Sequence, residues 1–194
     1  MALTRARPIA GDGPLIRRAR KQIASLIRRP RDRGQVIADV LEMRAMVEEA
    51  KGGEGAWDLK QTPGGLVDIE FIAQSLQLVH AAGHADLIST ETEAVLVAAA
   101  RAGLLPARDA EVLLPAHRLY QSLIQILRLC VPGMFRPEEA PRGLLDRLAK
   151  AGELPDFATL DAHVRATEAA VRKSFERLIG KVPAGSGSSD ASRH

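Results

Sequence analysis

Apolar residues recur at intervals of three and four along almost the whole of this 194-residue chain. This spacing places them on one side of an α-helix, whereas a half-buried β-strand would alternate apolar and polar residues, and no sustained alternation occurs. Aromatic residues make up only 3% of the chain although 46% of it is apolar, so the core must be built from aliphatic side chains. The pattern predicts an all-α fold, a single helical bundle of six or seven helices.

Prolines, glycines and capping residues mark where these helices begin and end. Asp12 and Pro14 are typical of a helix start, and Thr62 is expected to cap another helix with Pro63 in its first position. Pro115 is expected to kink or split the helix that contains it, because proline lacks the amide donor. The helices are expected near residues 15–29, 32–50, 63–82, 89–102, 106–131, 141–151 and 156–179.

The second expected helix has a clear core-facing stripe, made of Val36, Val40, Met43 and Val47. Around the bundle, composition divides the chain into three parts. We expect a basic N-terminal arm or interdomain linker at residues 1–14, the bundle domain at 15–180 and a disordered tail at 181–194, which lacks an apolar face.

Positive charge is concentrated at the N-terminal end. Residues 1–33 contain ten Lys and Arg against two acids, a net +8, while the whole chain is +3, which leaves −5 for the remainder. Such an arm can meet phosphate in a nucleotide or a nucleic acid, or a neighbouring acidic domain, or it can be a solvated helix face. Nucleic acid is the weaker reading, because aromatic residues for base stacking are scarce.

The sequence also bounds where the protein works. No apolar run is long enough for a membrane span, and a single cysteine excludes an intrachain disulfide, so we expect a cytoplasmic protein in a reducing compartment. Cys130 lies in an apolar run and is expected in the core. His80 and His84 have the spacing of two metal ligands on a helix, but no third ligand is near in sequence, and we expect no bound metal.

The most informative stretch is residues 57–78, which read WDLKQTPGGLVDIEFIAQSLQL. Trp57 is expected to be a packing anchor. Gly64 and Gly65 weaken a helix start unless another backbone or a ligand must approach closely. Asp68 has a simple structural explanation, since an acid near a helix N-terminus is favoured by the helix dipole. Glu70 either forms a salt bridge with an arginine of the basic arm, faces solvent, or lines a cleft.

This stretch closely resembles the signature of glutamine synthetase adenylyltransferase and its uridylyltransferase relatives. The opening, MALTRARPIAGD, and the segment DVLEMRAMVEE, which contains Met43 and Arg44, resemble the same family, so that the resemblance covers about residues 1–180. It implies the helical domain that follows the nucleotidyltransferase domain in the C-terminal, adenylylating half of that enzyme. That half transfers AMP from ATP to glutamine synthetase in nitrogen regulation and uses Mg²⁺.

The catalytic part of the family is not found in this chain. There is no Asp-x-Asp, and the only Gly-Ser run lies at residues 185–190, in the tail. The resemblance therefore implies an accessory role with no catalytic residue and no cofactor bound by this chain alone. Alternatively, the chain is a stand-alone regulatory module that binds a nucleotidyltransferase, glutamine synthetase or a PII-type signal protein.

By the same resemblance, seven residues are candidates for binding nucleotide or lining the cleft beside the catalytic domain. Two come from the arm, where they could reach phosphate or hold the domain interface, and five come from the motif. They are Arg5, Arg7, Lys60, Gly64, Gly65, Asp68 and Glu70.

Overall fold

The computed structural model describes residues 1–51 and 57–183, and all regular structure within them is helical. The expected all-α class and number of helices are confirmed. No helix in these residues has the length and apolarity needed to cross a bilayer. The α-helices are α1 (Gly13–Ile27), α2 (Arg33–Lys51), α3 (Leu66–His80), α4 (Thr92–Arg101), α5 (Ala107–Cys130), α6 (Arg142–Ala151) and α7 (Phe157–Leu178). Three short 3-10 helices are η1 (Ala2–Arg5), η2 (Ala85–Leu87) and η3 (Pro137–Glu139).

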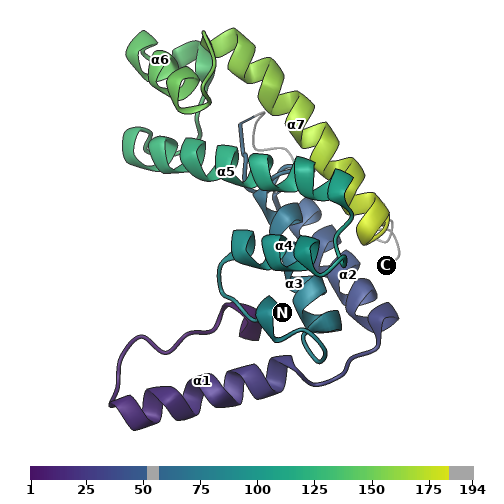
Figure 1. Ribbon diagram of the computed structural model, residues 1–194. Helices are drawn as coiled ribbons and strands as arrows, with labels where there is room; N and C mark the ends of the chain where they lie inside the picture. The colour runs from purple at the N-terminus through teal and green to yellow at the C-terminus, as the bar shows by residue number, and fades with distance from the viewer. Residues whose placement is uncertain (52–56, 184–194) are drawn as a thin grey trace, which may run out of the picture.

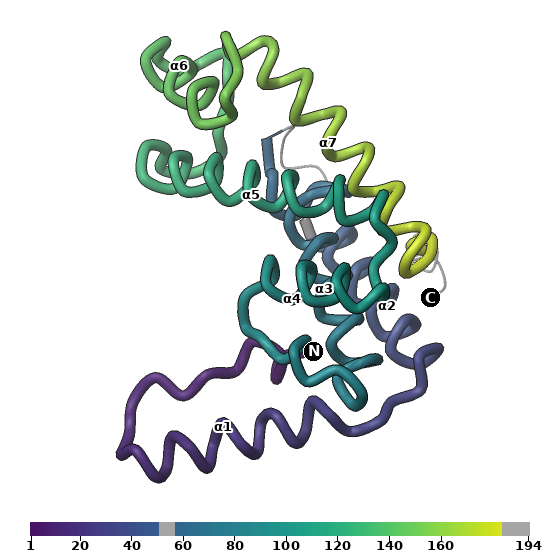
Figure 2. The backbone as a smooth tube through the Cα atoms, in the orientation of Figure 1, coloured from purple at the N-terminus to yellow at the C-terminus, as the bar shows by residue number. Residues whose placement is uncertain are grey.

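Helix α3 lies at the centre of the molecule, in contact with α2, α4, α5 and α7 (Figure 1). At one end, α6 packs against α5 and α7. At the other end, α1 lies apart from the other α-helices and contacts η1 (Figure 1). The arm that precedes α1 starts with η1, which contacts α3, and then loops out to the start of α1 (Figure 2).

The central position of α3 follows from its sequence. Its apolar side chains are distributed around most of the helix, and a helix of this kind must be covered on most sides. Even polar residues of α3 are enclosed, namely Asp68, Ser75 and Gln77. The core around it is aliphatic, as expected, and contains Val40, Ile69, Ile72, Leu87, Leu96, Leu113, Leu123, Leu148, Leu160 and Val171.

Three of the six aromatic residues gather in one cluster. Trp57 stacks on Phe157 with ring centroids 5.0 Å apart and meets the edge of Phe135 at 5.2 Å. Its indole N–H donates to Asp161 at 2.9 Å. The expected anchoring role of Trp57 is confirmed, and it ties the start of the motif to α7.

Most helix boundaries agree with expectation to within a few residues. The Asp12 side chain accepts a hydrogen bond from the Leu15 amide at 2.7 Å, which confirms it as the cap of α1. Pro115 lies inside α5, which continues as one helix through it, so the split allowed for does not occur. The tail expected to be disordered falls almost entirely on residues 184–194, outside those described.

Two expected core positions are wrong. Cys130 is exposed because it is the last residue of α5, where Arg128, Leu129 and Cys130 all lie beyond the core. In α2, the buried stripe continues from Val40 to Arg44, while Met43 is exposed. Arg44 is fully enclosed because buried acceptors are available to its guanidinium, a condition that spacing alone does not reveal.

Candidate functional site

The motif folds as a tight turn that leads directly into α3. The amides of Leu66 and Val67 donate to the carbonyls of Leu59 and Lys60, each at 2.9 Å, so the turn folds back on the helix start. Gly64 has a φ of +84°, a left-handed conformation through which a right-handed helix cannot continue. Helix α3 therefore begins at Leu66, with Gly65 as its cap, and the expected start at Pro63 is wrong.

The two glycines allow backbone to approach the turn closely. A Cβ on Gly64 would lie 1.9 Å from the carbonyl oxygen of Glu168 in α7, and one on Gly65 would lie 2.7 Å from the carbonyl oxygen of Leu59. Neither distance is compatible with a side chain. The close approach expected of this pair is thus made by the protein's own backbone, which packs α7 onto the motif.

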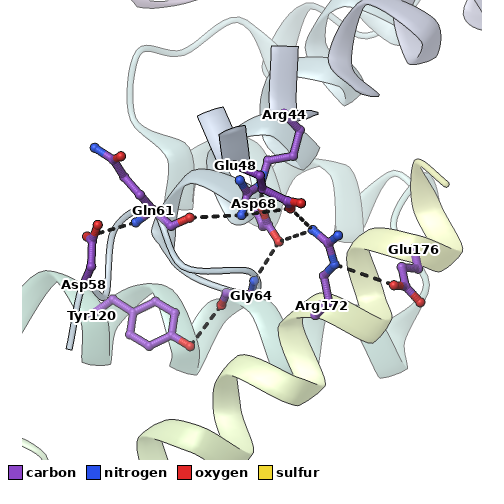
Figure 3. Close-up of polar contacts among 9 residues, drawn as sticks. All are labelled: Arg44, Glu48, Asp58, Gln61, Gly64, Asp68, Tyr120, Arg172 and Glu176. Carbon is purple, nitrogen blue, oxygen red and sulfur yellow. Dashed lines mark hydrogen bonds and ion pairs between the residues drawn. The ribbon is translucent and has the colours of Figure 1, made fainter. Parts of the chain in front are cut away.

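Asp68 is the centre of a buried polar network (Figure 3). One carboxylate oxygen accepts from the guanidinium of Arg44, and both side chains are completely enclosed. The other oxygen accepts from the Gly64 amide at 2.8 Å and lies 3.4 Å from Arg172 of α7. One acid in the first turn of α3 therefore joins α2, the glycine turn and α7.

Further partners complete the network. Arg44 donates to the carbonyl of Gln61 at 3.0 Å, and Arg172 pairs with Glu48 at 2.9 Å and with Glu176 at 3.6 Å. Removing one partner of a buried ion pair strands the other charge, which typically destabilises a protein by about 3–5 kcal/mol. In this structure Asp68 has a structural role, since its carboxylate has no exposed surface with which to line a cleft.

Two more groups of α5 and α7 lie beside the turn. The Tyr120 hydroxyl donates to the carbonyl of Gly64 at 3.1 Å, and burial raises the pKa of this phenol. Glu168 has one buried carboxylate oxygen with no hydrogen-bond partner among the described residues. Burial raises the pKa of Glu168 to about 7, against the opposing effect of Arg165.

Of the three arrangements expected for Glu70, the structure shows the salt bridge with an arginine of the basic arm. Arg5 lies 2.7 Å from Glu70, with side chains 47% and 14% exposed, and this pair fixes η1 against α3. His117 lies near it, and burial lowers the pKa of its imidazole despite the nearby carboxylates of Glu93 and Glu70. Arg118 then binds Glu93 at 2.8 Å, which links α5 to α4.

The two remaining cationic candidates do not join this cluster. Arg7 is exposed and lines a groove of about 450 Å³ between the arm, α1 and the residues around Ile88. Arg20 of α1 lines the same groove, whose floor is apolar. Lys60 is exposed on the motif turn. Of the predicted site residues, the structure thus joins Gly64 with Asp68 and Arg5 with Glu70, and leaves Arg7 and Lys60 on the surface.

The described carboxylates and histidines are dispersed or already paired. Within residues 1–51 and 57–183, no three His, Cys, Asp or Glu side chains gather as metal ligands, His80 and His84 included. The oxygens of Asp68 are already taken by two arginines and an amide.

Sequence reasoning missed the cationic half of the network. Arg172 carried no sequence signal, whereas Arg44 lies four residues after Val40 and eight after Val36, on the same helix face. The position of Arg44 on the apolar face therefore indicated a buried arginine, which would require a carboxylate partner. A second pair was missed for the same reason: Asp109 of α5, fully enclosed, is bound by Arg177 of α7.

Comparison with known proteins places these features in a family. A model of the GlnD PII-uridylyltransferase family matches residues 41–132. The bifunctional glutamine synthetase adenylyltransferase/adenylyl-removing enzyme of Rhodopseudomonas palustris (strain BisB5) is 48% identical over 180 residues. Those of Xanthobacter autotrophicus and Bradyrhizobium diazoefficiens are 46% and 45% identical over 179 and 185 residues.

These matches cover nearly all of this chain but only part of each relative. They include 92–95% of the chain and 18–19% of the relatives. The resemblance drawn from the motif is confirmed, and it extends well beyond the motif. Over nine-tenths of its length, the chain is thus a homologue of one helical segment of the glutamine synthetase adenylyltransferases, and it spans about 18% of their length.

Proposed function

We propose that the chain acts as a helical accessory domain of a glutamine synthetase adenylyltransferase, as the domain that follows the nucleotidyltransferase domain in its C-terminal, adenylylating half. The chemistry, with ATP and Mg²⁺, belongs to that catalytic domain, and the setting is the cytoplasm. The observation that carries the proposal is 48% identity to such an enzyme over 93% of the chain. The chain's part is to hold one wall of the catalytic cleft in place.

The buried polar network around Asp68 is consistent with an accessory role. Arg44, Asp68 and Arg172 lock α2, α3 and α7 around the glycine turn. The Arg5–Glu70 pair fixes the arm against the same central helix. The arm is thereby attached to α3, so a catalytic domain joined to the arm would be oriented by this contact. Arg7 and Lys60, both exposed, remain candidates for contact with nucleotide phosphate.

The test is a chimera in which this chain replaces the matching segment of the Rhodopseudomonas palustris (strain BisB5) enzyme. We expect the chimera to transfer AMP from ATP to glutamine synthetase in the presence of Mg²⁺, and the isolated chain to transfer none. Thermal unfolding and gel filtration establish that the chimera is folded. A folded chimera without activity contradicts the proposal, and so does AMP transfer by the isolated chain.

A second candidate is a stand-alone module that binds a PII-type signal protein or glutamine synthetase. This candidate is favoured by the match of residues 41–132 to a PII-uridylyltransferase family model. Isothermal titration of the isolated chain with each protein separates the two candidates. Micromolar binding to a PII-type protein, together with an inactive chimera, selects the second candidate.

A further inference from the structure

Helix α1 presents an apolar stripe that the described residues cover only in part. The stripe consists of Leu15, Ile16, Ala19, Ile23, Leu26 and Ile27, of which Ile27 is buried, Leu15 is exposed and the other four are half-buried. Leu15 is 59% exposed, and Ile9, in the arm just before the helix, is 87% exposed. A partly covered apolar stripe with exposed residues at its N-terminal end indicates an interaction surface.

The same helix bears a concentrated positive charge. From residue 13 to residue 31 there is no acid, and the basic residues are Arg17, Arg18, Arg20, Lys21, Arg28, Arg29 and Arg31. In the described part of the chain none of these seven forms an ion pair, whereas Arg44, Arg118, Arg172 and Arg177 all do. These positive charges are therefore available to pair with negative groups outside the described residues.

Apart from its Asp12 cap, helix α1 has little internal support. It has 15 residues, a length at which an isolated helix is marginal in water. Arg17 and Lys21 lie four residues apart on the same face of the helix, where like charges repel each other. A partner that covers the apolar stripe and brings negative charge would correct both defects.

We infer that α1 docks on an acidic protein surface, an apolar groove flanked by carboxylates, carried by another domain of the longer enzyme. This inference rests on the proposed function, since it identifies the surface through which the accessory domain holds its neighbour. The relatives supply chain for such a domain, because the matching segment is only 18% of their length.

The observations favour a protein over a lipid or nucleic-acid surface. Interfacial membrane helices typically insert Trp, Phe or Leu, and α1 offers two leucines but no aromatic residue to anchor it in a bilayer. A nucleic acid would neutralise the arginines but would leave Leu15 and its neighbours in water. Carboxylates beside an apolar groove satisfy both the cations and the stripe, and arginine binds carboxylates in a bidentate manner.

The test is hydrogen exchange over residues 13–27, measured in the isolated chain and in the chimeric enzyme without glutamine synthetase. We expect exchange at least tenfold slower in the chimera. Arg18→Glu with Lys21→Glu in the chimera should restore fast exchange. The matched control is Arg147→Glu with Lys150→Glu, which reverses two exposed charges at the same spacing on α6 and should leave α1 protected.

Three results overturn the inference. One is equal exchange of α1 in the chimera and the isolated chain, and another is protection that survives the α1 charge reversal. The third is protection of the isolated chain by phosphatidylglycerol vesicles or duplex DNA with none in the chimera. Because AMP transfer by the same chimera is measured separately, an active chimera with an unprotected α1 refutes this inference and leaves the proposed function standing.

Discussion

The centre and the N-terminal edge of this protein use charge in opposite ways. In α3 and its neighbours, Arg44 and Asp68 are enclosed and paired with each other. In α1, basic side chains such as Arg18 and Lys21 are exposed, and none is paired within residues 1–51 and 57–183. Charged residues at the centre therefore hold the fold, while those at the edge remain available to a partner.

The two acids of the motif, Asp68 and Glu70, differ in the same way as the centre and the edge of the molecule. Asp68 and Glu70 are two residues apart, so they point in different directions from the same helix. Asp68 points into the junction of α2 and α7, and Glu70 points toward the arm and holds Arg5. A functional signature can thus contain residues kept for folding beside residues that connect to another region.

The largest expected effect comes from breaking the centre at Asp68. Asp68→Asn keeps the shape of the side chain but removes the enclosed counter-charge of Arg44 and leaves it only the partly exposed Glu48 at 3.4 Å, so we expect a loss of about 3–5 kcal/mol in the free energy of unfolding. Urea unfolding of the isolated chain measures it. Arg18→Glu, at the exposed edge, is the control and should change stability by less than about 0.5 kcal/mol. Similar losses of unfolding free energy in the two variants would contradict the claim that charges at the centre hold the fold and those of α1 do not.

The next effect concerns the glycine turn that the network holds. Gly64→Ala places a Cβ against the Glu168 carbonyl and in a left-handed backbone conformation, so we expect destabilisation of at least about 2–3 kcal/mol. Gly83→Ala is the matched control, because a Cβ there meets nothing within 4 Å. Thermal unfolding compares the two, and equal melting temperatures would show that α7 does not press on the turn.

A smaller effect depends on pH and arises at Glu168. Its pKa is raised from an ordinary value of 4.5 to about 7 in the folded state. The folded protein then holds a proton that the unfolded chain has lost, so this group's contribution to stability falls as pH rises from about 4.5 to 7.

Glu168→Gln removes that dependence. We expect the variant to be more stable than the parent at pH 8 by about 1–2 kcal/mol, a figure reduced for the carboxyl's partial access to water. The two proteins should converge near pH 4. Urea unfolding at both pH values checks this, and a constant difference at the two pH values would show that Glu168 does not titrate as described.

The smallest effect is expected where the arm meets the centre. Glu70→Gln removes the partner of Arg5, which is half exposed, so we expect a loss of only about 0.2–1 kcal/mol in global stability. Hydrogen exchange should nevertheless become faster in residues 2–6 while α3 stays protected. A large global loss would mean that the arm belongs to the folding core.

Much of the fold could be predicted from local pattern. The spacing of Val36 and Val40 and the cap at Asp12 depend on neighbours in sequence, and both were confirmed. The burial of Arg44 and the exposure of Cys130 depend on which helix lies opposite, which periodicity does not encode. Likewise, α3 starts at Leu66 and not at Pro63 because Gly64, packed against the backbone of α7, has a left-handed conformation.

For the site, the sequence indicated the motif but not the use of its residues. The pairing of Glu70 with an arm arginine was among the predicted alternatives, because the basic arm supplied an obvious partner. The partners of Asp68 come from positions 24 residues before it and 104 residues after it. Contacts at such separation follow from the packing of α2 and α7 on α3, and only the structure reveals them.

The central claim is that the Arg44–Asp68 pair holds the fold together, and a double-mutant cycle tests it most directly. Urea unfolding would be measured for Arg44→Met, Asp68→Ala, the double variant and the parent chain. We predict a coupling of more than about 2 kcal/mol, with the double variant less destabilised than the sum of the single ones, since removing both charges strands neither. Losses that simply add, within about 0.5 kcal/mol, would contradict the claim.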